Sequence, residues 1–148
     1  MEITFLPILD DASAQASHAF ADELYRMEGL PMDEGRIAAM RELAGHPEAG
    51  GAWLIAAEGT AAGYVVLTAC YSLEFHGWFG LLDEFYIDER WRGKGLGTAA
   101  LEFVDEQCRA RGWKAVRLEV ALENLRAHEL YRRARYKVEE RHLMTKWL

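Results

Sequence analysis

The sequence predicts a single mixed α/β domain over residues 1–148. Two observations lead to this fold class. A β-rich centre precedes an alternation of helix, strand, helix and strand patterns, which is typical of a mixed sheet flanked by helices. The length suits one hydrophobic core and is too short for a second, and the chain contains no internal repeat or linker.

The elements of the first half can be placed from periodicity and turn residues. Alternating apolar and polar residues indicate strands, and apolar residues at spacings of three and four indicate helices. Glu58-Gly59-Thr60-Ala61 separates two β-rich runs and predicts an antiparallel hairpin. The expected elements are a strand at 3–5, a helix capped by Asp10 or Asp11 and ended near Gly29, a helix at 31–43, and strands at 53–57, 64–71 and 79–88.

The second half alternates between the two kinds of pattern. Apolar residues at helical spacing continue up to Gly112, which is a residue that commonly ends a helix. Strand-like alternation follows, and then a second helical pattern. We expect a helix at 96–111, a strand at 116–120, a helix at 124–134 and β structure from Tyr136 to Leu148.

Arg92-Gly93-Lys94-Gly95-Leu96-Gly97 lies between the third central strand and the helix at 96–111. Its glycines let backbone N–H groups turn outward, and the positive end of the helix dipole favours an anion, so the loop predicts a pyrophosphate site. A nucleotide P-loop needs Gly-Lys followed by Ser or Thr, whereas Gly95 follows Lys94 here. The dinucleotide fingerprint fits Gly95, Gly97 and Ala100 weakly, because a charged turn separates them from the strand.

The pattern Arg-x-x-Gly-x-Gly, counted from Arg90 or Arg92, resembles the acyl-CoA pyrophosphate loop of the GNAT superfamily of N-acetyltransferases. The order of the elements is similar to the GNAT fold over nearly the whole chain. This resemblance implies a central mixed, mostly antiparallel sheet in which the strands before and after the helix at 96–111 are splayed, so that acetyl-CoA enters the gap. The residues implied for binding it are the backbone of Tyr86 and Ile87 for the pantetheine, and Arg92, Gly93, Lys94, Gly95, Leu96, Gly97 and Thr98 for the pyrophosphate.

Asp83 and Glu84 lie on the strand that leads into the glycine loop, where GNAT enzymes often place the general base. An amine with the pKa of lysine, about 10.4, is only about one part in a thousand neutral at physiological pH, so a carboxylate has to remove its proton. Only one of two neighbouring residues faces a given side of a regular strand, although a bulge changes this parity. Glu84 is favoured as the base, with Asp83 as the alternative.

The segment Asn124-Leu125-Arg126-Ala127-His128-Glu129-Leu130-Tyr131 resembles a second GNAT pattern. The resemblance implies that Tyr131 is the general acid for the leaving thiolate, and that Asn124 contacts CoA or orders the splayed strands. GNAT sequences usually have Gly-Phe shortly afterwards, whereas this chain has Arg135-Tyr136. A left-handed Arg135 would cost about 1 kcal/mol, so we expect the helix to end in another geometry.

The net charge and the composition limit the kinds of partner and cofactor that we expect this protein to bind. The net charge of −7 argues against nucleic acid or an anionic membrane and favours a cationic acceptor. The histidines and cysteines show no metal-ligand spacing, so no metal is expected. The lack of a signal-peptide pattern and of a long apolar span predicts a cytoplasmic protein. A homodimer is an expectation from the family resemblance alone.

Together these features predict an N-acetyltransferase that moves an acetyl group from acetyl-CoA directly to a primary amine of a small molecule, protein or peptide. The alternative is a non-catalytic sensor that binds acyl-CoA. A sensor needs neither a base nor an acid, so the presence of Tyr131 together with Asp83 or Glu84 favours the enzyme.

Overall fold

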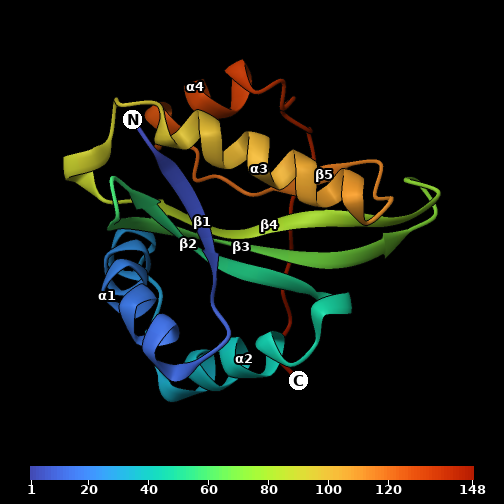
Figure 1. The fold of residues 1–148 in the computed structure, drawn as a ribbon. Helices are drawn as coiled ribbons and strands as arrows, with labels where there is room; N and C mark the ends of the chain where they lie inside the picture. Colours follow the sequence, from blue (N-terminus) through green and yellow to red (C-terminus); the bar gives the residue numbers. More distant parts are fainter.

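The computed structural model describes all of residues 1–148, and they form one five-stranded sheet with helices on both sides (Figure 1). The strands are β1 (Ile3–Pro7), β2 (Gly50–Ala57), β3 (Thr60–Ser72), β4 (Gly77–Ile87) and β5 (Val116–Leu118). The helices are α1 (Asp11–Glu28), α2 (Glu34–Ala44), α3 (Leu96–Ala110) and α4 (Leu125–Arg133), with short 3-10 turns η1 (Pro47–Ala49) and η2 (Glu89–Trp91). The expected mixed α/β class is confirmed. None of the helices is both long enough and apolar enough to span a bilayer.

The strands follow the order β1-β2-β3-β4-β5, antiparallel from β1 to β4 and parallel between β4 and β5. The parallel pairing joins only residues 80–82 to β5, whereas β4 continues to Ile87. The two strands therefore splay apart, as the family resemblance implies. One edge of β4, over residues 83–87, is left without a partner strand.

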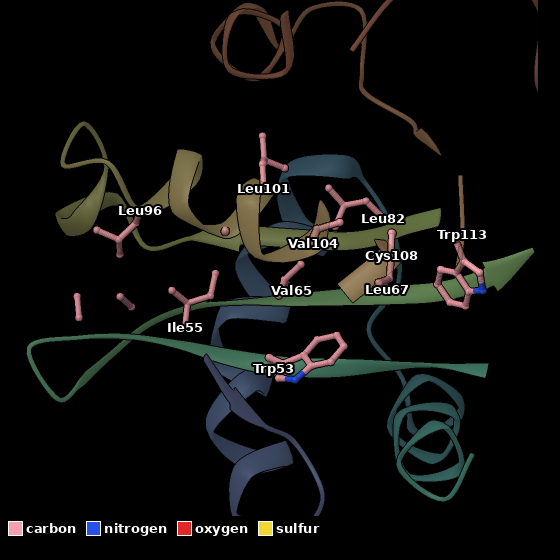
Figure 2. Packing of buried hydrophobic residues seen from close by; sticks show 13 residues of the cluster. Trp53, Ile55, Val65, Leu67, Leu82, Leu96, Leu101, Val104, Cys108 and Trp113 are labelled. Atoms are coloured by element: carbon pink, nitrogen blue, oxygen red, sulfur yellow. The ribbon is translucent and has the colours of Figure 1, made fainter. Parts of the chain in front are cut away.

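Separate apolar cores lie on the two faces of the sheet. The larger core lies under α3, whose apolar residues at spacings of three and four form one stripe against the sheet (Figure 2). Leu82 of β4 belongs to this core. The smaller core lies under α1 and α2 and includes Tyr64 and Tyr86 from the sheet. Whether a β4 side chain packs in the larger or the smaller core therefore shows on which face of the sheet it lies.

Capping residues determine where α1 and α2 begin. The Asp10 carboxylate accepts a hydrogen bond from the Ser13 N–H at 2.8 Å, so Asp10 is the cap of the first helix. Asp33 caps α2 by accepting from the Arg36 N–H at 3.1 Å. Because of this cap, α2 begins at Glu34, later than the predicted start at residue 31. The cap places Arg36 in the first turn of α2.

The chain after α4 forms no strand, so the predicted β structure from Tyr136 to Leu148 is wrong. Alternating residues indicate β propensity, but a strand also needs a neighbouring edge for its backbone hydrogen bonds. β5 ends at Leu118, earlier than the predicted residue 120, and offers a short edge. The last residues instead run along the molecule as an exposed segment, in which Arg141 pairs with Glu74 at 3.4 Å (Figure 1).

Candidate functional site

A β-bulge in β4 separates the two candidate bases. Val66 of β3 pairs with Glu84, and the next residue, Leu67, pairs with Leu82, so Asp83 is the extra residue of β4. Leu82 packs under α3, whereas Glu84 contacts α1 and α2 on the other face. In a regular strand Leu82 and Glu84 would share one face. The bulge therefore turns Glu84 toward α1 and α2.

Both carboxylate oxygens of Glu84 already have donors. Oε1 accepts from Arg36 Nη2 at 2.6 Å and from the Tyr64 hydroxyl at 2.8 Å, and Oε2 accepts from the Tyr25 hydroxyl. The side chains of Glu84 and Arg36 are only 12% and 10% exposed. Burial, followed by contact with Glu84, raises the pKa of Tyr25 to about 12, so this hydroxyl remains a donor. The residue favoured from the sequence as the base thus lies in a closed network of donors.

Asp83, in contrast, is exposed and takes part in no ion pair. Its pKa is raised, first because the surrounding protein removes part of its hydration and then because of the negative charges of Glu84 and Glu119. The positive charge of Arg36 acts in the opposite direction. A carboxylate with a raised pKa is a better proton acceptor than an ordinary aspartate, so Asp83 is the better placed of the two candidates.

Two further acids, Glu28 and Glu119, act electrostatically with Asp83 and were missed in the sequence. The splayed gap between β4 and β5, where Asp83 and Glu119 lie, is called the opening below. Glu28 is the last residue of α1, and burial followed by the charges of Glu84, Glu119 and Asp83 raises its pKa. Glu119 directly follows β5, across the splayed gap from β4. Neither acid takes part in an ion pair. No local pattern marks these residues, because each is a lone acid in its own segment and only the fold gathers them.

Tyr131 lies on α4 and is also close enough to this opening to experience its charge. Burial, followed by the charge of Glu28, raises the pKa of Tyr131 to about 12. Its ring packs against that of Tyr136, with 5.7 Å between the centroids. Asn124 caps α4 by accepting from the Ala127 N–H at 3.2 Å, so its side chain serves the helix itself. Tyr131 is therefore held in place and protonated at neutral pH, as a general acid has to be.

The end of α4 differs from the sequence-based expectation. Arg135 has a φ of 71°, and the N–H groups of Arg135 and Tyr136 donate to the carbonyl oxygens of Arg132 and Tyr131. This is the left-handed Schellman ending that glycine usually provides. The expectation that the helix would end in another geometry is therefore wrong. The two terminal hydrogen bonds compensate part of the cost of a left-handed arginine.

The glycine loop presents a row of backbone N–H groups without partners. Outside the helices and strands, residues 93–98 donate no backbone hydrogen bond, and the first N–H groups of a helix have no partner within it. The Arg92 N–H is engaged, because it donates to the Glu89 carbonyl oxygen at 3.2 Å. Gly93 and Gly95 have φ of 73° and 90°, and a Cβ at either position would meet nothing within 4 Å. With the N-terminus of α3 beside it, this loop is arranged to bind an anion.

Arg92 connects the loop to β4. Its Nε donates to the Ile87 carbonyl oxygen at 2.9 Å, and its guanidinium lies 5.4 Å from the centroid of the Tyr86 ring. The Asp88 N–H donates toward β3, to the Ala62 carbonyl oxygen, and successive N–H groups of a strand alternate in direction. The Ile87 N–H therefore points toward the splayed gap, whereas the Tyr86 backbone faces β3. Of the two residues predicted to pair with the pantetheine, only Ile87 directs its N–H there.

The remaining loop residues predicted to bind the pyrophosphate either pack against the rest of the protein or are exposed to solvent. Leu96 is buried in the core under α3. A Cβ on Gly97 would lie 3.0 Å from Leu130 Cδ2, so glycine lets α4 pack onto the start of α3. Lys94 and Thr98 are exposed. No three His, Cys, Asp or Glu side chains are grouped so that they could hold a metal ion.

Comparison with known proteins agrees with this geometry. Residues 12–135 match the model of the acetyltransferase (GNAT) family. The chain belongs to the GNAT family. The resemblance stated from the glycine loop is thereby confirmed.

Individual similar proteins differ in how much of the chain they match. An uncharacterized N-acetyltransferase of Methanocaldococcus jannaschii is 36% identical over 67 residues, which are 45% of this chain but only 29% of that protein. An integron cassette protein from the mobile metagenome of Cole Harbour Salt Marsh has a TM-score of 0.82 at 31% identity, over 99% of this chain and 90% of that one. An aminoglycoside acetyltransferase from an uncultured soil metagenomic sample shares the fold, with a TM-score of 0.77 at 12% identity over 99% of this chain and 95% of that one.

Proposed function

We propose that this GNAT protein transfers an acetyl group from acetyl-CoA directly to a primary amine. The observation that carries the proposal is the row of unpartnered N–H groups at residues 93–98, next to the unpaired edge of β4. Amides at a helix N-terminus suit a pyrophosphate, and a free strand edge suits the amide groups of an extended pantetheine arm. Acetyl-CoA bound there would supply an activated thioester.

Two side chains would move protons. Asp83 is exposed at the splay point and has a raised pKa, so its carboxylate would accept the proton of the acceptor amine. Tyr131, whose pKa is raised to about 12, would hold a proton on its hydroxyl for the leaving sulfur. Glu84 is assigned no proton transfer, because its oxygens are bound by Arg36 and by two tyrosine hydroxyls.

The acceptor in this proposal is cationic, either a small molecule or a lysine-bearing peptide. Glu28, Asp83 and Glu119 bring negative charge to the opening, and none of them has a cationic partner in the protein. A protonated amine would supply that partner and would be attracted by the field of the three carboxylates. A protein of similar fold is named an aminoglycoside acetyltransferase, which supports an amine acceptor.

The proposal is tested by measuring release of free thiol from acetyl-CoA in the presence of polyamines, aminoglycosides, amino acids and lysine-bearing peptides. At least one amine should stimulate release. Asp83→Asn should then lower kcat/KM for that amine by about 100-fold or more, and Tyr131→Phe should lower kcat by a similar factor, because each removes a proton-transfer group. Asp22→Asn, on the exposed side of α1, is the matched control and should change neither constant.

Two results would count against this function. Unchanged turnover in both Asp83→Asn and Tyr131→Phe would exclude the assigned chemistry. Tight CoA binding without thiol release for any amine would favour the alternative of an acyl-CoA sensor.

A further inference from the structure

A buried ion pair lies directly behind the proposed base. Arg36 Nη2 and Glu84 Oε1 are 2.6 Å apart, and both side chains are almost fully removed from solvent. Arg36 comes from α2 and Glu84 from β4, two segments that no local sequence pattern connects. A buried pair of this kind adds little net stability compared with an apolar pair, so its presence calls for another explanation.

Two tyrosine side chains, each from a further element, contact both members of this ion pair. The Arg36 guanidinium lies 5.6 Å from the ring centroid of Tyr25 on α1 and 5.8 Å from that of Tyr64 on β3. The hydroxyls of these same tyrosines donate to the two oxygens of Glu84. The four side chains together, named here the Arg36 network, therefore connect α1, α2, β3 and β4 at the bulge.

The Arg36 network controls which carboxylate is free. A bulge presents two neighbouring carboxylates next to the opening, and either of them could take a proton from an amine. Arg36 and the two tyrosines occupy both oxygens of Glu84, so of the two neighbouring carboxylates only Asp83 remains available. The pair is not neutral in its effect on Asp83, because Glu84 raises the pKa of Asp83 more than Arg36 lowers it.

We propose that Arg36 and Glu84 are positioning residues of the acceptor site, which keep Glu84 out of proton transfer and leave Asp83 as the single base under a net negative influence. The role of Asp83 as base rests on the proposed function, whereas the electrostatic part does not. The other charged or titratable groups that face Asp83 are Glu119 after β5, Glu28 on α1 and Cys70 on β3. None of these belongs to the Arg36 network.

The direct test is a carbon NMR titration of the Asp83 carboxyl in CoA-free protein labelled at aspartate, with Asp83→Asn used to assign the signal. Glu84→Gln removes a negative neighbour and leaves Arg36 uncompensated, and both changes favour ionised Asp83, so the midpoint should fall. The Glu84→Gln and Arg36→Met double variant removes both charges. Its midpoint should lie between those of Glu84→Gln and the wild type, because the stronger negative neighbour and the weaker positive one are lost together.

Arg41→Met is the matched control. Arg41 lies on the same helix and pairs with Asp11 at 3.2 Å, but both side chains are largely exposed, so the Asp83 midpoint should not move. The double variant leaves no lone buried charge, so it should fold even if the Glu84→Gln single variant is less stable. Comparable CoA affinity of all variants confirms that the glycine loop is intact.

The result that overturns the proposal is an Asp83 midpoint that does not fall in Glu84→Gln, or a double variant with a midpoint at or below that of Glu84→Gln. If Asp83 is the base, kcat/KM for the acceptor, measured at a pH below the acid limb, should be higher in Glu84→Gln than in the wild type. The rise should be about tenfold for each pH unit by which the NMR midpoint falls. Absence of thiol release in the wild type would refute the proposed function and leave the order of the NMR midpoints as a separate result.

Discussion

The chemistry assigned to Asp83 depends on how much water reaches its carboxylate and on the charges around it. Partial removal from water, together with Glu84 and Glu119, raises its pKa above that of an ordinary aspartate. Only the ionised form accepts a proton, so activity is present above this pKa and is lost as the pH falls through it. Tyr131 does not limit activity in this range, because its pKa of about 12 keeps it protonated.

The pH dependence of kcat/KM for the acceptor should therefore show an acid limb that moves when a neighbouring charge is removed. Glu119→Gln takes away a negative charge facing Asp83, so the limb should move to lower pH. Initial rates measured across the acid range, with the acceptor well below KM, give the position of the limb. A limb at the same pH in Glu119→Gln and wild type would contradict the assignment of Asp83.

The sequence alone could not decide whether Asp83 or Glu84 is the base. The sequence locates the pair, because both precede the glycine loop on a recognisable strand. Which of the two side chains faces a given side of the sheet depends on a β-bulge. This bulge appears only in the register between β3 and β4. The partners of Glu84 come from residues 25, 36 and 64, and no local pattern predicts that these meet.

Helix and loop boundaries depend mostly on local signals, which is why many of them could be predicted. Gly29 ends α1 and Gly95 precedes α3, both with the positive φ that glycine adopts readily. The strand expected after Tyr136 depended on a distant partner edge, and there the prediction was wrong. The end of α4 is an intermediate case, because the hydrogen bonds are those of a glycine ending although the residue is Arg135.

Arg135→Gly should stabilise the protein. It removes a left-handed cost of about 1–2 kcal/mol and adds the greater unfolded-state freedom of glycine, so we expect a net gain of about 0.5–1 kcal/mol in the free energy of unfolding. Denaturant unfolding of the variant and wild type measures this difference. Arg133→Gly, at the last residue of α4, is the control; its backbone is helical, so glycine relieves no left-handed cost there and should not stabilise the protein. A destabilised Arg135→Gly would show that the arginine side chain contributes more than its backbone costs.

On the scale of the whole molecule, the proposed site is assembled from both sides of the sheet. α1 and α2 supply Glu28 and Arg36 from one face, and α3 and α4 supply the glycine loop and Tyr131 from the other (Figure 1). The two cores therefore hold the site only while the sheet between them is intact. Cys70 and Cys108 report on this integrity, because Cys108 is buried under α3 and Cys70 is partly exposed.

Thiol labelling should follow this difference. Burial, followed by the charge of Asp105, raises the pKa of Cys108 to about 11, so its thiolate is scarce as well as shielded. We expect a disulfide reagent to label Cys70 in the native protein and Cys108 only on global unfolding. The single variants Cys70→Ser and Cys108→Ser assign the two phases. Rapid labelling of Cys108 under native conditions would show that the core under α3 opens locally.

The most direct test of the whole account is an amide NMR titration of the labelled protein with CoA. The account predicts that the backbone amides of residues 93–98 show the largest shifts, together with the Ile87 amide on the free edge of β4. Shifts centred elsewhere, with the signals of residues 93–98 unchanged at saturating CoA, would contradict it.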